Sequence, residues 1–172
     1  MLSEAELGAL LAGFTREAFR FELRDRYNST VGREPYRKWE AGEADDYAWH
    51  QGWLEKVRAD RAAGKSWRRV RIVSVPVSDY TRYGIHIGRL NVQAGEDIRY
   101  LDRAAAEQLG VKPYDAWLLD ETQLIRLHFH ATDDTFTGAE LVTDPEVVGR
   151  HLAWRDLAWQ HAQPLDEFAA TL

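Results

Sequence analysis

Along the whole chain, stretches with an apolar residue at every second position alternate with stretches where apolar residues recur every three to four positions. Leu7, Leu10 and Leu11 have helical spacing, whereas Phe19 and Phe21 alternate with charged residues, as in a half-buried strand. Such alternation is typical of layered α/β structure and not of a helical bundle or a sandwich of sheets. We predict one α/β domain, with mixed α+β as an alternative, built on a mixed sheet of about five to seven strands flanked by helices.

Several helix starts are visible in the sequence. Ser3 and Glu6 have the spacing of a capping box, which predicts a helix over about residues 4–13. Further helices are expected after Pro35, after Asp45 and Asp46 with the stripe Trp49, Trp53, Leu54 and Val57, from Asp102 to Leu109, and after Asp144 with Pro145 in its first turn. We interpret the tryptophan stripe as inward-facing core.

Strands are predicted where β-branched and aromatic residues gather between turn signals. These segments are Val70–Val75, Ile98–Leu101, Asp115–Asp120, Leu124–Phe129 and Ala139–Val142. The third and fourth are expected to form a hairpin across Glu121 and Thr122.

One segment, Tyr80–Leu90, has two interpretations. Ser78 is placed to cap a helix there, although Gly84 and Gly88 disfavour helix by roughly 1 kcal/mol each. A strand over residues 83–90 is the rival, because Ile85 and Ile87 also alternate. A helix lets the flanking strands lie parallel through a crossover, and a strand does not.

The sequence contains no cysteine, which excludes disulfides, thiolate nucleophiles and cysteine-ligated metal centres. Residues Met1–Glu4 do not form the basic start of a signal peptide. No stretch approaches the roughly eighteen apolar residues that a membrane span needs. We expect a cytoplasmic protein without a membrane partner.

The formal net charge of −6 disfavours approach to a phosphate backbone unless basic residues cluster on one face. The densest basic run is Trp67–Arg71, which reads Trp-Arg-Arg-Val-Arg. Alternation in a strand sends these arginines to both faces, so no continuous basic surface follows. We predict no direct contact with nucleic acid.

Four segments resemble an actinobacterial family of uncharacterised proteins, and the resemblance runs from about residue 14 to the C-terminus. The segments are Phe19–Tyr27 (FRFELRDRY), Trp67–Tyr83 (WRRVRIVSVPVSDYTRY), Ala94–Leu101 (AGEDIRYL) and Tyr114–Asp120 (YDAWLLD). Members of that family are typically encoded beside small helix-turn-helix regulators. The resemblance therefore implies a regulatory setting with such a regulator as partner, and it implies no mechanism, because the family has no established activity.

The order of elements in the second half also looks like one half of the phospholipase D fold. The chemistry of that superfamily requires a histidine nucleophile with a lysine two residues later. None of the lysines here, at positions 38, 56, 65 and 112, has a histidine two positions earlier. The resemblance implies at most a catalytically inactive half domain, since fold does not carry function.

Polar residues gather near the predicted ends of two strands. Ligands tend to bind near strand ends in open α/β sheets, and guanidinium groups together with a helix N-terminus can hold an anion. We predict a ligand-binding set of Arg71, Tyr80, Arg82, Glu96 and Arg99. The alternative is a buried set of arginine–carboxylate pairs that organises the fold.

His128 and His130 lie two positions apart on a predicted strand, so both point to one face and are spaced to share a metal ion. The alternative is a solvated strand face beside Arg126. We assign no metal ligand, because no third ligand has a sequence signature. Nucleophile-elbow, phosphate-loop and dinucleotide patterns are absent, so we predict no catalytic residue and no cofactor.

Two hypotheses about function follow from these observations. The first is a non-catalytic regulatory or binding protein that acts through a protein partner, the helix-turn-helix regulator implied by the family resemblance. The second is a sensor or enzyme for a small anionic ligand that bears phosphate or carboxylate. A cavity lined by the predicted arginines favours the second, and arginines paired to interior carboxylates count against it.

Overall fold

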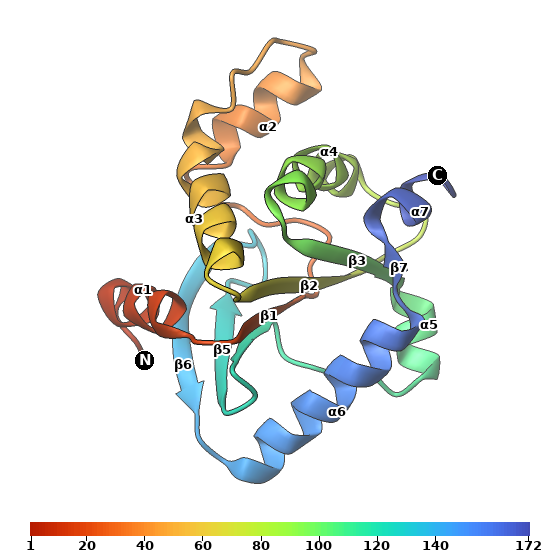
Figure 1. The fold of residues 1–172 in the computed structure, drawn as a ribbon. Helices are drawn as coiled ribbons and strands as arrows, with labels where there is room; N and C mark the ends of the chain where they lie inside the picture. The colour runs from red at the N-terminus through yellow and green to blue at the C-terminus, as the bar shows by residue number, and fades with distance from the viewer.

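A seven-stranded mixed sheet runs through the protein, and the computed structural model describes residues 1–172 (Figure 1). The strands lie in the order β6-β5-β4-β1-β2-β3-β7. Their bounds are β1 Glu17–Glu22, β2 Ser66–Val73, β3 Asp97–Asp102, β4 Ala116–Leu119, β5 Gln123–Phe129, β6 Phe136–Val142 and β7 Gln163–Pro164. The predicted α/β class with a mixed sheet is confirmed.

Helices cover both faces of this sheet. The bounds are α1 Glu4–Gly13, α2 Arg33–Glu40, α3 Gln51–Ala62, α4 Asp79–Ala94, α5 Arg103–Gln108, α6 Pro145–His161 and α7 Leu165–Ala169, with a 3-10 turn η1 at Ala48–His50. The helices α3 and α4 lie over one face, α5 and α6 lie over the other, and α1 lies beside β6 (Figure 1). None of these helices is both long and apolar enough to cross a bilayer.

The segment with two interpretations is helical. Ser78 caps α4, because its hydroxyl oxygen accepts the Thr81 N–H at 3.1 Å. The strands on either side, β2 and β3, pair in parallel, as the helical alternative requires. The rival strand over residues 83–90 is wrong, because Ile85 and Ile87 are both buried on the helix that joins the two parallel strands.

The central strand β1 differs from the sequence-based expectation of a half-buried strand. It pairs with β2 on one side and β4 on the other, and helices cover both of its faces. Phe19 and Phe21 point to the α6 face, and Arg20 points to the opposite face, where it is only 5% exposed. A charged residue at an alternating position is therefore buried here.

The helix predicted to carry the tryptophan stripe is present, but it begins later than expected. Tyr47 has a φ angle of 56°, which is not helical and prevents a helix from continuing through this residue. Trp49 therefore lies in η1, and α3 begins only at Gln51. Asp45 accepts the Tyr47 N–H at 3.0 Å and the Trp49 indole N–H at 2.9 Å. Asp46 accepts the Ala48 N–H at 3.0 Å. Asp45 and Asp46 therefore stabilise the connection that precedes α3.

The predicted hairpin of β4 and β5 is confirmed as an antiparallel pair. The positive φ angles fall on Asp120 (51°) and Glu121 (63°), one residue earlier than the expected turn at Glu121 and Thr122. Aspartate tolerates this left-handed conformation better than most residues because its side chain bonds to nearby backbone.

Candidate ligand-binding cavity

A cavity of about 390 Å³ lies between α3, α4 and the sheet. Seven of its nineteen lining residues are tyrosine or tryptophan. They come from the loop after β1, from η1, from the helices α3 and α4, and from the strands β3 and β4. They are Tyr27, Trp49, Trp53, Tyr80, Tyr83, Tyr100 and Trp117. Clefts of this size with apolar walls and a few fixed polar groups are typical of small-molecule sites.

The floor of the cavity is charged because of strand register. Glu22 of β1 lies opposite Arg71 of β2, and Arg69 lies two residues earlier on the same face of β2. Glu22 binds Arg69 through Oε1 (2.9 Å to Nη1) and Arg71 through Oε2 (2.8 Å to Nε). Burial alone raises the pKa of Glu22, but attraction by both arginines outweighs burial and lowers it to about 2.

The two arginines differ in how completely they are paired. Arg69 uses all three guanidinium nitrogens, since Nη1 binds Glu22 while Nε and Nη2 bind Glu96 Oε1 at 2.8 and 2.7 Å. Arg71 contacts a carboxylate only through Nε, which lies 2.8 Å from Glu22 Oε2 without good hydrogen-bond geometry, and neither of its Nη groups lies within ion-pair distance of a carboxylate. The Tyr100 hydroxyl is buried and makes no hydrogen bond of good geometry, and its ring centroid lies 5.8 Å from the Arg71 guanidinium carbon. Burial raises the pKa of Tyr100, and the nearby Arg71 opposes this rise. The cavity thus has unused donors at its floor.

Gly84 of α4 makes room for Arg71. A Cβ atom at position 84 would lie 2.0 Å from Arg71 Nη1, much closer than any non-bonded contact allows. The glycine that disfavours helix in the sequence therefore allows the guanidinium to lie against α4.

A chain of hydrogen bonds connects the cavity wall to the buried charges. Asn91 donates through Nδ2 to Glu96 Oε2 at 2.9 Å, so its Oδ1 faces His50 Nε2 at 2.5 Å. The proton between them must therefore belong to His50 Nε2, which leaves His50 Nδ1 as an acceptor when the ring is neutral. Trp53 donates to the same Glu96 oxygen at 3.4 Å.

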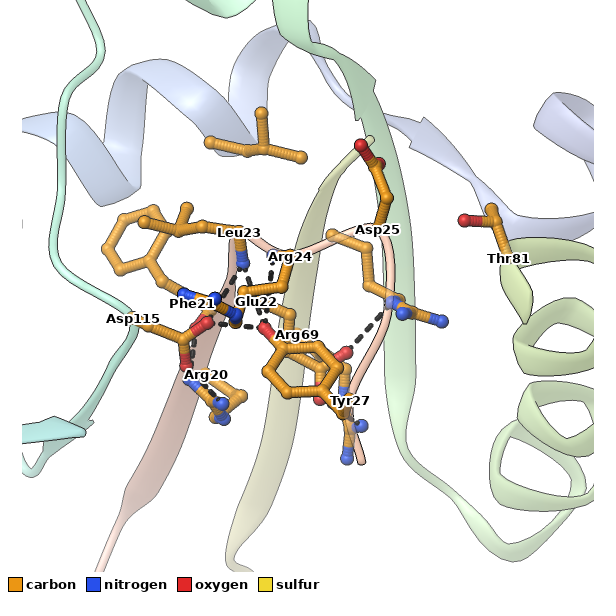
Figure 2. Close-up of polar contacts among 12 residues, drawn as sticks. Arg20, Phe21, Glu22, Leu23, Arg24, Asp25, Tyr27, Arg69, Thr81 and Asp115 are labelled. Carbon is orange, nitrogen blue, oxygen red and sulfur yellow. Dashed lines mark hydrogen bonds and ion pairs between the residues drawn. The ribbon is translucent and has the colours of Figure 1, made fainter. Parts of the chain in front are cut away.

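The loop after β1 supplies Tyr27 to the cavity wall, and a second network of polar contacts holds this loop (Figure 2). The Tyr27 hydroxyl donates to Asp115, which also pairs with Arg20. The Leu23 N–H donates to the Tyr27 oxygen at 3.0 Å. Burial and the neighbouring Asp115 raise the pKa of Tyr27 well above its usual value, so this hydroxyl stays protonated and remains a donor.

The structure brings together only part of the predicted set. Arg71 and Tyr80 line the cavity, and Glu96 lies behind the wall, bound to Arg69. Arg82 and Arg99 do not line this cavity. Arg82 is exposed on α4, and Arg99 lies on the opposite face of the sheet because it alternates with Ile98, which lines the cavity.

On that opposite face Arg99 packs against α6. Its guanidinium carbon lies 4.0 Å from the centroid of the Trp159 ring, and Arg68 lies 3.9 Å from the same ring. This confirms that the basic run at residues 67–71 divides between the two faces. Sequence reasoning missed Glu22, Arg69 and Asn91, and the spacing of Arg69 and Arg71 on one strand face was the one local signal for them.

The two histidines at the end of β5 have separate partners. His128 Nε2 lies 3.4 Å from Glu140, and His130 lies beyond the end of the strand with Nδ1 3.6 Å from Asp133. No group of three histidine, aspartate or glutamate side chains is placed to hold a metal ion. The pair therefore gives no donor set on which a metal centre can be argued.

No match to the chain was found among curated proteins. A solved structure with similarity is that of TrmBL2, described as an archaeal chromatin protein with a novel mode of DNA binding. The sequence identity is 10%, the TM-score is 0.46, and the match covers 92% of this chain. The chain spans about half, 49%, of that protein. A likeness at this level carries no argument about DNA binding here.

One family model matches nearly the full length, over residues 5–170. It is described as a domain of unknown function, DUF6879. The matched range includes every residue of the cavity described above. The chain therefore belongs to the DUF6879 family.

Proposed function

We propose that this protein is a non-catalytic sensor that binds a small molecule in the cavity between α3, α4 and the sheet. The observation that carries the proposal is Arg71, which is 6% exposed and yet has only one of its three nitrogens paired. Most buried polar side-chain atoms in proteins have a hydrogen-bond partner, as all three guanidinium nitrogens of Arg69 do here. A ligand with acceptor oxygens would supply the missing hydrogen bonds of the Arg71 guanidinium.

The surroundings of Arg71 fix it before any ligand arrives. Nε is held by Glu22, and one side of the guanidinium lies against Gly84. A donor that is already in place loses little side-chain entropy on binding. An anionic ligand, bearing carboxylate or phosphate, is therefore the class that the floor supports.

The charged groups of the floor are suited to binding and not to proton transfer. Glu22 has a pKa of about 2, so it holds no proton at neutral pH and is a poor general base. Arginine stays protonated under all ordinary conditions. This supports a sensor in preference to an enzyme.

A thermal-shift panel tests the proposal. Small carboxylates, phosphate esters and neutral aromatic compounds are compared on the wild-type chain and on Arg71→Lys, which keeps the charge but loses the planar fork. We expect anionic compounds to raise the melting temperature of the wild type, and Arg71→Lys to weaken their binding about tenfold. Arg82→Lys, an exposed change on α4, is the matched control and should respond as the wild type. No response in the whole panel, or an equal response in Arg71→Lys, contradicts the proposal.

A protein partner is the second proposed component, and the family resemblance supports a helix-turn-helix regulator. The chain carries a net charge of −6, and the segment Glu40–Asp46, which starts at the last residue of α2, has four acidic side chains and no basic one. Opposite charge on a basic DNA-binding protein speeds association more than it tightens the complex. The likeness to a phospholipase D-like half domain stays a prediction, and nothing in this proposal depends on it.

Co-expression with the neighbouring regulator tests the partner. The two proteins should co-purify at moderate salt, and the association rate should fall as ionic strength rises. Absence of a complex removes the partner and leaves the ligand proposal standing, because the cavity is complete within this chain.

A further inference from the structure

We infer that the cavity selects a planar ring carrying one carboxylate, and that it discriminates against a phosphate on the same ring. This inference rests on the proposed function and names its ligand class. Its first basis is the shape of the free donors. The two Nη groups of Arg71 form a planar fork that matches the two oxygens of a carboxylate. The Tyr100 ring packs near this guanidinium, and its buried hydroxyl is a further donor without a partner of good geometry.

The second basis is charge balance. The buried charges at the floor are Arg69 and Arg71 against Glu22 and Glu96, so their formal sum is zero. The next buried pair, Arg20 with Asp115, is also neutral. No excess positive charge exists to offset a dianion, and the solvation that an ion loses on burial grows steeply with its charge. A single negative charge is therefore favoured over the two of a phosphate monoester.

The third basis is the wall. Trp49 and Trp53 on the α3 side and Tyr80 and Tyr83 on the α4 side line a volume of about 390 Å³, near the lower end for ligand cavities. Aromatic pairs prefer offset-stacked or edge-on contacts, which a flat ring supplies. A one- or two-ring acid thus satisfies wall and floor together.

Three compounds with one ring system separate these contributions. Isothermal titration at pH 7.5 compares 2-naphthoate, the neutral 2-naphthamide and 2-naphthyl phosphate, which is mostly dianionic at that pH. We expect 2-naphthoate to bind at least tenfold more tightly than either of the others, because a charge-assisted fork is lost in the amide and charge is in excess in the phosphate. Benzoate should also bind more tightly than cyclohexanecarboxylate if ring planarity matters.

Two variants test whether the carboxylate of the ligand binds at the floor of the cavity. Tyr100→Phe removes only a buried hydroxyl without a partner, so it should fold as stably as the wild type while weakening 2-naphthoate about fivefold to tenfold and leaving 2-naphthamide unchanged. Gly84→Ala should displace the Arg71 guanidinium and abolish the preference for the acid. Gly149→Ala, at an exposed helical glycine with open space around it, is the matched control and should keep wild-type affinity.

The outcomes distinguish this inference from the proposed function. Tighter binding of the phosphate, equal binding of acid and amide, or a Tyr100→Phe variant that weakens all three compounds alike overturns the carboxylate and leaves a ligand-binding cavity. Failure of all three naphthyl compounds also overturns it. The sensor proposal itself falls only if the wider thermal-shift panel gives no response that depends on Arg71.

Discussion

Asp120 illustrates how one carboxylate fixes the start of the central strand. Its two oxygens accept the N–H groups of Thr15 (2.7 Å), Arg16 (2.7 Å) and Glu17 (3.0 Å), which lead into β1. Burial is the largest single influence and raises the pKa of Asp120, but these backbone donors together outweigh burial and lower the pKa to about 2. The turn between β4 and β5 is thereby attached to the beginning of β1.

Replacing Asp120 by asparagine should therefore destabilise the protein in a pH-dependent way. The folded pKa of about 2 lies below the unfolded value of roughly 3.9, so the stabilisation is complete above about pH 4 and is lost as the pH falls toward 2. We expect a loss of about 1–2 kcal/mol at pH 7, after allowance for solvent screening, and almost none near pH 2. Urea denaturation at pH 7, 4 and 2.5 measures this. A pH-independent difference contradicts the role of the charge.

Arg20 and Asp115 form an ion pair that is almost fully buried, since Arg20 is 5% exposed and Asp115 is 8% exposed. Arg20→Met leaves Asp115 charged and without its cation, and such removal of one partner destabilises by about 3–5 kcal/mol. Arg82→Met, at an exposed arginine of α4 with no ion pair, should stay within about 0.5 kcal/mol of the wild type. Chemical denaturation of both variants decides the matter, and equal effects would falsify the structural importance of the pair.

These buried charges show where residue-level prediction from sequence stops. Arg20 and Glu22 alternate with phenylalanines, and that pattern correctly predicts a strand but wrongly predicts a solvated face. Their partners, Asp115 and Arg71, lie far away in the chain and meet them only through tertiary pairing of strands. The compensation of a charge is a property of strand order and register, which local periodicity does not contain.

Among the helices and strands, α4 contains two glycines because two of its tertiary contacts are too close for a larger side chain. Gly84 accommodates Arg71, and a Cβ at Gly88 would lie 2.7 Å from Leu165 Cδ1 of α7. Each glycine weakens the helix by roughly 1 kcal/mol in isolation, and each permits a close tertiary contact. Helix propensity and packing therefore oppose each other at these positions, which is why the sequence left helix and strand open.

We expect glycine-to-alanine substitutions in two helices to change the stability of the protein in opposite directions. Gly149→Ala in α6 meets nothing within 4 Å and should stabilise by about 0.5–1 kcal/mol through reduced backbone entropy of the unfolded chain. Gly88→Ala should destabilise by about 1–3 kcal/mol, since Leu165 is buried and must move. Melting temperatures of the two variants test this, and a stabilising Gly88→Ala is the outcome that contradicts it.

Helix ends were the most predictable features. The Ser3–Glu6 capping box, the Asp102 cap and the Asp144 cap with Pro145 behind it all occur as the sequence indicates. Their bonds join residues two or three apart, so they need no tertiary information. The cavity is the opposite case. Trp49 and Trp53 have the spacing of an ordinary core stripe, and they line a cavity only because tertiary packing brings them together with α4 and the charged floor.

In the whole molecule, the two faces of the sheet differ in chemistry. The α6 face carries one continuous apolar cluster that includes Phe19, Val70 and Leu118. On the other face, β2 presents Trp67 to one apolar cluster and Val73 to another, with Arg69 and Arg71 between them. The charged floor thus separates two apolar clusters, and both border the cavity, one through Trp117 and the other through Tyr100.

This arrangement predicts a graded distribution of local stability. The central strand β1 is bonded on both edges and buried on both faces, so its amides should exchange with solvent only when the whole protein unfolds. The helix α1 has no buried residue, and its leucines are only partly covered. We expect its amides to exchange through local opening, at a free energy several kcal/mol below that of β1.

Hydrogen exchange measured by mass spectrometry tests this distribution with peptides over residues 4–13 and 17–22. Leu10→Ala removes part of the contact between α1 and the rest of the protein, so it should speed exchange in the first peptide and leave the second unchanged. Because the cavity is built from α3, α4 and the sheet, ligand binding should then slow exchange around the cavity without protecting α1. Protection of α1 equal to that of β1 contradicts the gradient, since it would require α1 to unfold only with the sheet.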